Sequence, residues 1–310
     1  MKNTERRNAL QAVGFLLPSL IGFAGLSILP MIISLVISTT SWDGLSELAL
    51  FSAAFADGAA FADTYFTGLS NYAAIFTGAE LYQVLGNTLR FVLLYLPFML
   101  LASFGVATIL NKEIPGGTFF RVLYYIPVIT SWVAGALIWK WVLSPEYGVV
   151  NNVLAIFGIA GPGWLQSPKW AMPGIVLASV WKDMGFFGLM LFAGLRGINK
   201  EYYEAADLDG AGKGRQLLHI TLPLLSPVFF FVITISMITA FQVFPQVMIM
   251  TPDGGPGGST MVMVERVYRY AFRYYEMGYA SALSWVLFII ILSLTLVQTR
   301  LQDKWVVYDA

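Results

Sequence analysis

The chain has 310 residues, of which 57% are apolar and only 12% are charged. A typical soluble domain is about 25% charged, so this composition indicates a protein embedded in a lipid bilayer. The 18 basic and 18 acidic residues balance, which argues against a nucleic-acid-binding surface. The absence of cysteine and the single histidine exclude disulfides, thiolate metal sites, cysteine nucleophiles and multi-histidine metal sites.

Six apolar segments are long enough to cross a membrane as helices, which takes about 20 residues each. They are residues 10–38, 86–110, 118–143, 173–198, 226–251 and 279–301. The first follows a basic N-terminus, but its uncharged run is too long for the core of a signal peptide, so we expect an uncleaved span. The predicted fold is an all-α membrane protein with one transmembrane domain over residues 1–310.

The distribution of lysine and arginine predicts the orientation of these spans. The N-terminus, the loops 111–121 and 196–215 and the C-terminal end are basic, so both termini are expected in the cytoplasm. The loop 39–85 has five acidic residues and no basic ones, which places it outside. The outer loop 252–278 is the exception, because it carries Arg266, Arg269 and Arg273. Their spacing predicts one stripe of a short helix that faces protein; the sequence assigns them no further role.

A polar segment, residues 199–223, separates the fourth and fifth spans. A helix is predicted from Lys200 to Leu208, with Asn199 as its N-cap and Glu201 in its first turn. Three glycines are expected to end it: Gly210, Gly212 and Gly214. A second short helix is predicted from Arg215 to Thr221, after which Pro223 and Pro227 are expected to punctuate the start of span five.

One face of the predicted 200–208 helix suits docking to another protein. Glu204 and Leu208 lie one helical turn apart, so a carboxylate stands beside an apolar side chain, and Ala205 and Ala206 keep this surface narrow. The nearby Gly210–Lys213 hints at a nucleotide-binding loop. The Walker A pattern needs Ser or Thr after the lysine, where this chain has Gly214, so no ATP site is expected in this stretch.

Span five carries a polar stripe made of Ser236, Thr239, Gln242 and Gln246, spaced by three, three and four residues. Such a stripe is unfavourable in lipid and should face another helix or a water-filled cavity. Two glutamines near phenylalanine rings favour a hydroxyl-rich ligand, while hydrogen bonding between packed helices is the alternative.

Span four contains two adjacent charges, Lys182 and Asp183. Each costs roughly 2.5–3.5 kcal/mol in the middle of a membrane helix, so this helix must face protein or water. Adjacent residues point about 100° apart on a helix, which predicts different partners for the two. They either mark a transport pathway or form ion pairs with a neighbouring subunit.

The polar segment also carries a distinct pattern: Glu204-Ala205-Ala206, then Gly210, then Ile220-Thr221-Leu222-Pro223. Further matches are Asn87-Thr88, Tyr125-Ile126-Pro127 and Gly254-Gly255-Pro256. These residues match the EAA–G–I-x-LP signature and other motifs of permease subunits of ATP-binding-cassette (ABC) importers. Over about residues 10–300 the chain resembles carbohydrate permeases of the maltose and glycerol-3-phosphate type.

The resemblance implies that residues 199–223 form a coupling helix that docks on an ATPase subunit. The residues implied in docking are Glu204, Ala205, Ala206, Leu208, Asp209, Gly210, Ile220, Leu222 and Pro223. The implied partners are a second permease subunit, two ATP-binding subunits that hold ATP and Mg, and an external solute-binding protein. The chain itself would be non-catalytic, without a cofactor or metal, in a bacterial or archaeal cytoplasmic membrane.

Positions that line the sugar pocket in that family fall here at Val128, Trp132, Lys182, Asp183, Phe186, Ser236, Thr239 and Ala240, and the polar stripe adds Gln242 and Gln246. The charged pair departs from the maltose type, so the identity of the sugar or polyol is not carried over. Whether this subunit or the second permease holds the substrate is left open. The alternative function is an ion-coupled secondary transporter of a polar solute, which leaves residues 199–223 unexplained.

Overall fold

The computed structural model describes residues 13, 15–45, 65–112 and 117–307. Within these residues the regular structure is helical, with one isolated bridge between Thr40 and Phe66. The chain divides into two compact units. Unit 1 comprises Met1–Gly78 and Val267–Val286, and unit 2 comprises Ala79–Arg266 and Leu287–Ala310.

In the described residues, five helices are long and apolar enough to cross a membrane, or six spans if a bent helix pair counts as one. The five are Phe15–Ile37, Ala79–Asn111, Ala171–Gly197, Lys213–Phe241 and Met277–Lys304. This agrees with the predicted all-α membrane fold. Residues 10–12 and 14 of the first predicted span lie outside the described residues.

Unit 1 joins the first span to the start of the last one. The first span includes the π-helical turn η1 (Ala24–Ile28) and α2 (Leu29–Ile37), and the short helix α5 (Ser70–Thr77) follows. The indole of Trp285, in the part of α16 (Met277–Leu301) that belongs to unit 1, donates to Ser34 Oγ at 3.0 Å. Asn71 Nδ2 donates to the Thr40 carbonyl at 2.8 Å, so polar contacts fix this junction.

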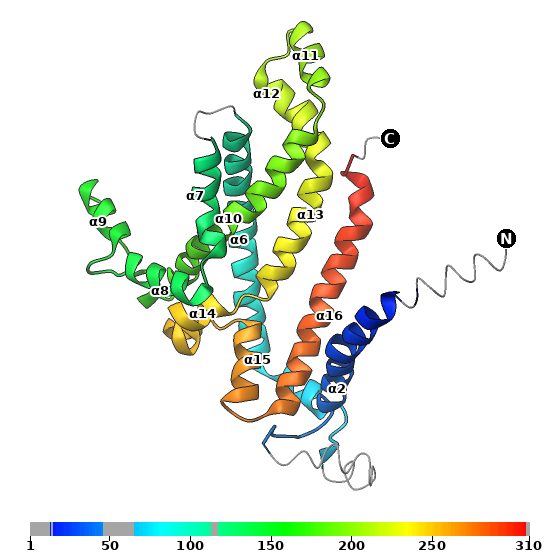
Figure 1. The fold of residues 1–310 in the computed structure, drawn as a ribbon. Coiled ribbons are helices and arrows are strands. Elements are labelled where there is room, and N and C mark those ends of the chain that lie inside the picture. The colour runs from blue at the N-terminus through cyan, green and yellow to red at the C-terminus, as the bar shows by residue number, and fades with distance from the viewer. Residues whose placement is uncertain (1–12, 14, 46–64, 113–116, 308–310) are drawn as a thin grey trace, which may run out of the picture. The chain divides into compact units, whose positions relative to one another are not determined.

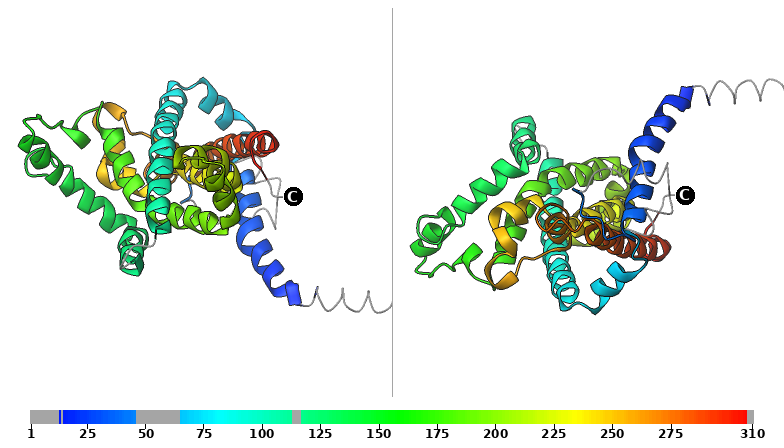
Figure 2. Two further views of the ribbon diagram at one scale, coloured as in Figure 1. Left: turned by 90° about the horizontal axis from the view of Figure 1, so that it is seen from above. Right: turned by 90° about the horizontal axis from the view of Figure 1, so that it is seen from below.

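Unit 2 is built on α6 (Ala79–Asn111) and α10 (Ala171–Gly197), which pack side by side along their length, with α13 (Leu222–Phe241) against both (Figures 1 and 2). Phe91, Met99 and Leu191 are buried at this contact. Gly188 allows the close approach, since an added Cβ would lie 2.9 Å from Val106.

The third span is bent. It consists of α7 (Gly117–Ile129) and α8 (Trp132–Val142), which meet at 106°, so the prediction of one unbroken helix over 118–143 is wrong. Ser131 has an extended backbone and caps α8 by accepting from Ala134 N at 3.3 Å. Figure 1 shows α8 and α9 (Val149–Ile156) leading away from the α6–α10 pair.

The polar segment between α10 and α13 forms α11 (Lys200–Leu208), as predicted, and the Asn199 side chain caps it by accepting from Glu201 N at 3.1 Å. Gly210 ends it with a φ of +74°. The second helix, α12 (Lys213–Gln216), continues through the π-helical turn η3 (Leu217–Thr221) into α13 without a break.

Pro223 does not mark the start of a separate helix, because the described helix Lys213–Phe241 runs through it. Pro223 lies in the first turn of α13, directly after the π-helical turn, where the shift in hydrogen-bond register accommodates the missing N–H. Pro227 also lies inside α13.

The fifth span ends earlier than predicted. Helix α13 stops at Phe241, and a separate helix α14 (Pro245–Met250) follows, so the prediction of one helix over 226–251 is wrong. Pro245 explains the break, because the residue before a proline is driven out of the helical region; Phe244 has φ −149° and ψ −65°. The predicted polar stripe is thus divided between two helices, with Gln242 as the C-cap of α13 and Gln246 in α14.

The glycine-rich segment after α14 forms the turns η4 (Pro252–Gly254) and η5 (Pro256–Gly258), followed by α15 (Met263–Phe272). Asn87 Nδ2 holds this segment to α6 by donating to the carbonyls of Gly258 at 2.9 Å and Met261 at 3.0 Å. Arg266 is buried and pairs with Glu80 at 3.0 Å. The expectation that the arginine stripe faces protein is confirmed for Arg266, whereas Arg273 is exposed.

Candidate functional site

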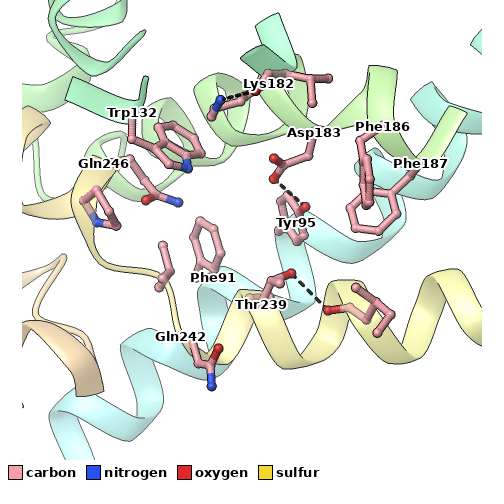
Figure 3. A pocket seen from close by; sticks show the side chains of 15 residues that line it. Phe91, Tyr95, Trp132, Lys182, Asp183, Phe186, Phe187, Thr239, Gln242 and Gln246 are labelled. Atoms are coloured by element: carbon pink, nitrogen blue, oxygen red, sulfur yellow. Dashed lines mark hydrogen bonds between the residues drawn. The ribbon is translucent and has the colours of Figure 1, made fainter. Parts of the chain in front are cut away.

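Unit 2 contains a cavity of about 380 Å³ between its helices (Figure 3). It is lined from α6, the bent α7–α8 pair, α10, α13 and the start of α14. The lining residues are Phe91, Tyr95, Val128, Trp132, Lys182, Asp183, Phe186, Phe187, Ile235, Thr239, Ala240, Gln242, Val243, Pro245 and Gln246. Four stretches far apart in the sequence, residues 91–95, 128–132, 182–187 and 235–246, therefore meet at one place.

The structure brings every predicted pathway residue to this cavity except Ser236. Ser236 is fully buried and its hydroxyl donates to its own helix, to Val232 O at 2.6 Å; Ile235 lines the wall instead. The end of α13 and the break before α14 explain how Gln242 and Gln246 still reach the same space although they are not on one helix.

Sequence reasoning missed the contribution of α6, which supplies Phe91 and Tyr95. Their rings stack at 5.4 Å and both side chains are almost completely buried. The available signal was the spacing of four residues, which puts two aromatic rings on one helix face. That spacing is equally typical of ordinary packing between helices.

Lys182 is buried, and its ammonium donates to three backbone carbonyls at the bend of the third span. The acceptors are Pro127 O at 3.0 Å, Val128 O at 3.1 Å and Thr130 O at 2.6 Å. These carbonyls lie at and just beyond the C-terminal end of α7, where the helix dipole favours a positive charge. Pro127 O also accepts from Thr130 N at 3.3 Å. Lys182 thus caps α7 and stabilises the bend; its Nζ also lies 5.3 Å from the centre of the Trp132 ring.

Asp183 points to a different partner, as the sequence predicted. The Tyr95 hydroxyl donates to Asp183 Oδ2 at 2.7 Å (Figure 3). Of the described residues that line the cavity, only Lys182 and Asp183 are charged, so their charges balance within its wall.

Gln246 is buried in the cavity wall against α10, and only one of its two side-chain amide atoms has a hydrogen-bond partner. Its Nε2 donates to Ser179 Oγ at 3.3 Å, and its Oε1 is buried without a partner. The Ser179 hydroxyl donates its own proton to Ile175 O at 2.8 Å, so Ser179 Oγ must accept from the glutamine. This fixes the amide orientation and leaves Oε1 as an open acceptor.

Aromatic rings cover much of the remaining wall. Phe186 and Phe187 meet edge to face at 5.2 Å, and Trp132 stands on the other side, beside the Gln246 amide (Figure 3). Aromatic faces with a few placed polar groups are typical of small-molecule sites, and the volume lies at the lower end of their range. In the described part of the chain, no group of three or more His, Asp or Glu is placed to hold a metal ion.

The predicted docking residues lie away from this cavity, around α11. Leu208 is 90% exposed, and Glu204, Ala205, Asp209 and Gly210 are exposed as well. The remaining predicted docking residues are half-buried and belong to α11, η3 or the start of α13: Ala206, Ile220, Leu222 and Pro223.

Partly buried polar contacts stabilise the turn between α11 and α12. Gln216 Nε2 donates to Asp207 Oδ1 at 2.5 Å and to Ala211 O at 3.1 Å. The hydroxyls of Tyr203 and Thr221 share a hydrogen bond of 3.0 Å. Helix α11 is therefore attached firmly to the helix that continues into α13.

The model of the family described as "Binding-protein-dependent transport system inner membrane component" matches residues 68–306. The chain is 35% identical over 309 residues to the probable ABC transporter permease protein YesP of Bacillus subtilis, covering 98% of this chain and 94% of that protein. It is 37% identical over 236 residues to the sulfoquinovosyl glycerol transport system permease protein SmoG of Agrobacterium fabrum, covering 76% of each.

The fold is also similar to a solved structure. A chain in the crystal structure of a bacterial ABC transporter involved in the import of the acidic polysaccharide alginate matches with a TM-score of 0.76 over 98% of both chains. The two sequences are 24% identical, so this likeness concerns the fold alone.

Proposed function

This chain belongs to the family of binding-protein-dependent transport system inner membrane components, and on that basis we propose that it is a transmembrane permease subunit of an ATP-driven importer that moves a sugar or sugar-like solute into the cytoplasm. The observation that carries the proposal is the cavity with aromatic walls and polar groups among the membrane-length helices. The name of one relative supports a carbohydrate, since SmoG is a sulfoquinovosyl glycerol permease.

We place α11 and both chain termini in the cytoplasm, following the positive-inside rule. In this arrangement the exposed face around Leu208 contacts one of two ATP-binding subunits, which supply ATP hydrolysis. A second permease subunit completes the pathway, and an external solute-binding protein delivers the substrate. The description of the matching family, whose transport systems are binding-protein-dependent, supports such a partner.

The helices on either side of α11 give the proposal a mechanical basis. Helix α10 ends three residues before α11 begins, and it carries the cavity residues Lys182, Asp183 and Phe186. On the other side of α11, the helix formed by α12, η3 and α13 runs without a break to the cavity residues Thr239 and Ala240. A displacement of α11 by the ATPase would therefore reach two walls of the cavity through rigid helices. Alternating access would follow as the cavity opens to one side and then to the other.

The proposed function is tested by measuring whether ATP hydrolysis or an ion gradient drives sugar uptake. The permease, its second permease, the ATPase subunits and the binding protein are reconstituted in proteoliposomes, and sugar uptake is followed with and without ATP. We expect uptake to require ATP hydrolysis and to persist when ionophores dissipate ion gradients. Uptake that needs no ATP and collapses with ionophores would instead identify an ion-coupled secondary transporter.

A further inference from the structure

We propose that the cavity is selective for an uncharged, hydroxyl-rich sugar, with Asp183 and Gln246 of this subunit accepting hydrogen bonds from its hydroxyls. The inference rests on the proposed transport function and specifies its substrate class. It follows from which hydrogen-bonding groups in the wall are already used and which are open.

The one cationic group among the described lining residues, the Lys182 ammonium, has no hydrogen-bond donor left for a ligand. An ammonium group has three N–H donors, and Lys182 directs them to Pro127 O, Val128 O and Thr130 O, all within 3.1 Å. An anionic substrate could bond to Lys182 only by uncapping the end of α7. The charge of Lys182 therefore offsets Asp183 in the wall without offering a donor to a bound carboxylate, sulfonate or phosphate.

The open groups, by contrast, include strong acceptors. Asp183 accepts one hydrogen bond, from Tyr95 to Oδ2, whereas an ionised carboxylate offers about four acceptor sites on its two oxygens. Gln246 Oε1 is buried and unpartnered, and leaving such an acceptor unpaired costs free energy until a ligand donor arrives. Both groups line the same cavity from different helices, α10 and α14.

A sugar hydroxyl suits this arrangement because it donates to one group and accepts from another. The neutral side chains of Trp132 and Gln242 also line the cavity, and both can donate hydrogen bonds to the hydroxyl oxygens of the sugar. A carboxylate or phosphate on the substrate would instead face two acceptors that it cannot bond. The phenyl rings of Phe91 and Phe186 are suited to covering the apolar face of a sugar ring.

The test uses the complete reconstituted complex and a defined pool of sugars. The pool contains maltose, galactobiose and mannobiose as uncharged members, digalacturonate, dimannuronate and glycerol-3-phosphate as anions, and a glucosamine disaccharide as a cation. The vesicle contents are analysed by mass spectrometry with and without ATP. We expect ATP-dependent accumulation of an uncharged member.

Accumulation led by an anionic or cationic member would overturn the inference while leaving the proposed function intact. If a member accumulates equally well without ATP, the proposed function itself fails. The two failures are therefore distinguishable.

Two variants then assign the selectivity to this subunit. We expect Asp183→Asn and Gln246→Leu each to reduce uptake of the uncharged sugar about tenfold at a limiting concentration, because each weakens or removes one acceptor. Asn can still accept from Tyr95, so the fold is retained. Thr295→Val is the control, since the Thr295 hydroxyl bonds its own helix at Ile291 O and lies outside the cavity. Wild-type uptake by both acceptor variants would contradict the assignment.

Discussion

At the scale of single residues, Lys182 and Asp183 show how adjacent charges are accommodated in an apolar helix. Insertion of each costs roughly 2.5–3.5 kcal/mol at mid-membrane, so each needs a compensating partner. Lys182 finds its partners in backbone carbonyls more than 50 residues earlier in the chain, and Asp183 finds a tyrosine on α6. Neither partner is visible in the local sequence, although the divergence of the two side chains is.

We expect Lys182→Met to destabilise the subunit, because it removes the ammonium group that donates to three carbonyls at the end of α7. Loss of partners for buried polar groups costs about 1–3 kcal/mol, which should lower the thermal unfolding midpoint of the purified complex by a few degrees. Lys182→Arg keeps a positive donor group and should lose less stability. An unfolding midpoint for Lys182→Met equal to the wild type would show that this cap does not stabilise the bend.

At the scale of elements, the link from α11 to α13 depends on a buried side chain. Gln216 is 3% exposed and ties the α11–α12 turn together through Asp207 and Ala211. The π-helical turn that follows lets Pro223 sit inside one long helix rather than at a break. The turn and the helix therefore form one continuous connection between the proposed ATPase contact and the cavity.

We expect Gln216→Leu to weaken the coupling between ATP hydrolysis and sugar transport, because it removes two hydrogen bonds that attach α11 to the helix leading into α13. The amount of sugar moved per ATP hydrolysed should fall while the ATPase subunits remain bound, as measured in proteoliposomes. Lys200→Met is the matched control, because Lys200 is an exposed residue of the same helix α11 and lies outside the contacts that Gln216 makes. If Gln216→Leu and the wild type move the same amount of sugar per ATP hydrolysed, the Gln216 contacts do not transmit motion from α11 to the cavity.

At the scale of the whole molecule, the long apolar helices and α11 could be predicted because their signals are local. Hydropathy marks the spans, and Asn199 and Gly210 mark the two ends of α11. The bend of the third span could not be predicted, since Lys182 stabilises it from another helix. The end of α13 had a local signal in Pro245, but the apolar run beyond that residue concealed it.

The cavity was predicted in part for the same reason. Polar and charged residues stand out in an apolar span, so Asp183, Gln242 and Gln246 were identified from sequence. Phe91 and Tyr95 did not stand out, because aromatic residues are common inside membrane helices. Ser236 was included for its spacing, although its hydroxyl bonds its own helix.

The proposed function depends above all on binding of the ATP-binding subunits to the exposed face of α11. The purified permease pair would be mixed with the ATPase subunits, and complex formation measured by size-exclusion chromatography for the wild type, Leu208→Asp and Leu208→Met. Leu208 is 90% exposed, so neither change should disturb folding. We expect the wild type and Leu208→Met to form the complex and Leu208→Asp not to form it, because a buried unpaired charge is costly. Complex formation by Leu208→Asp at wild-type affinity would contradict this proposal.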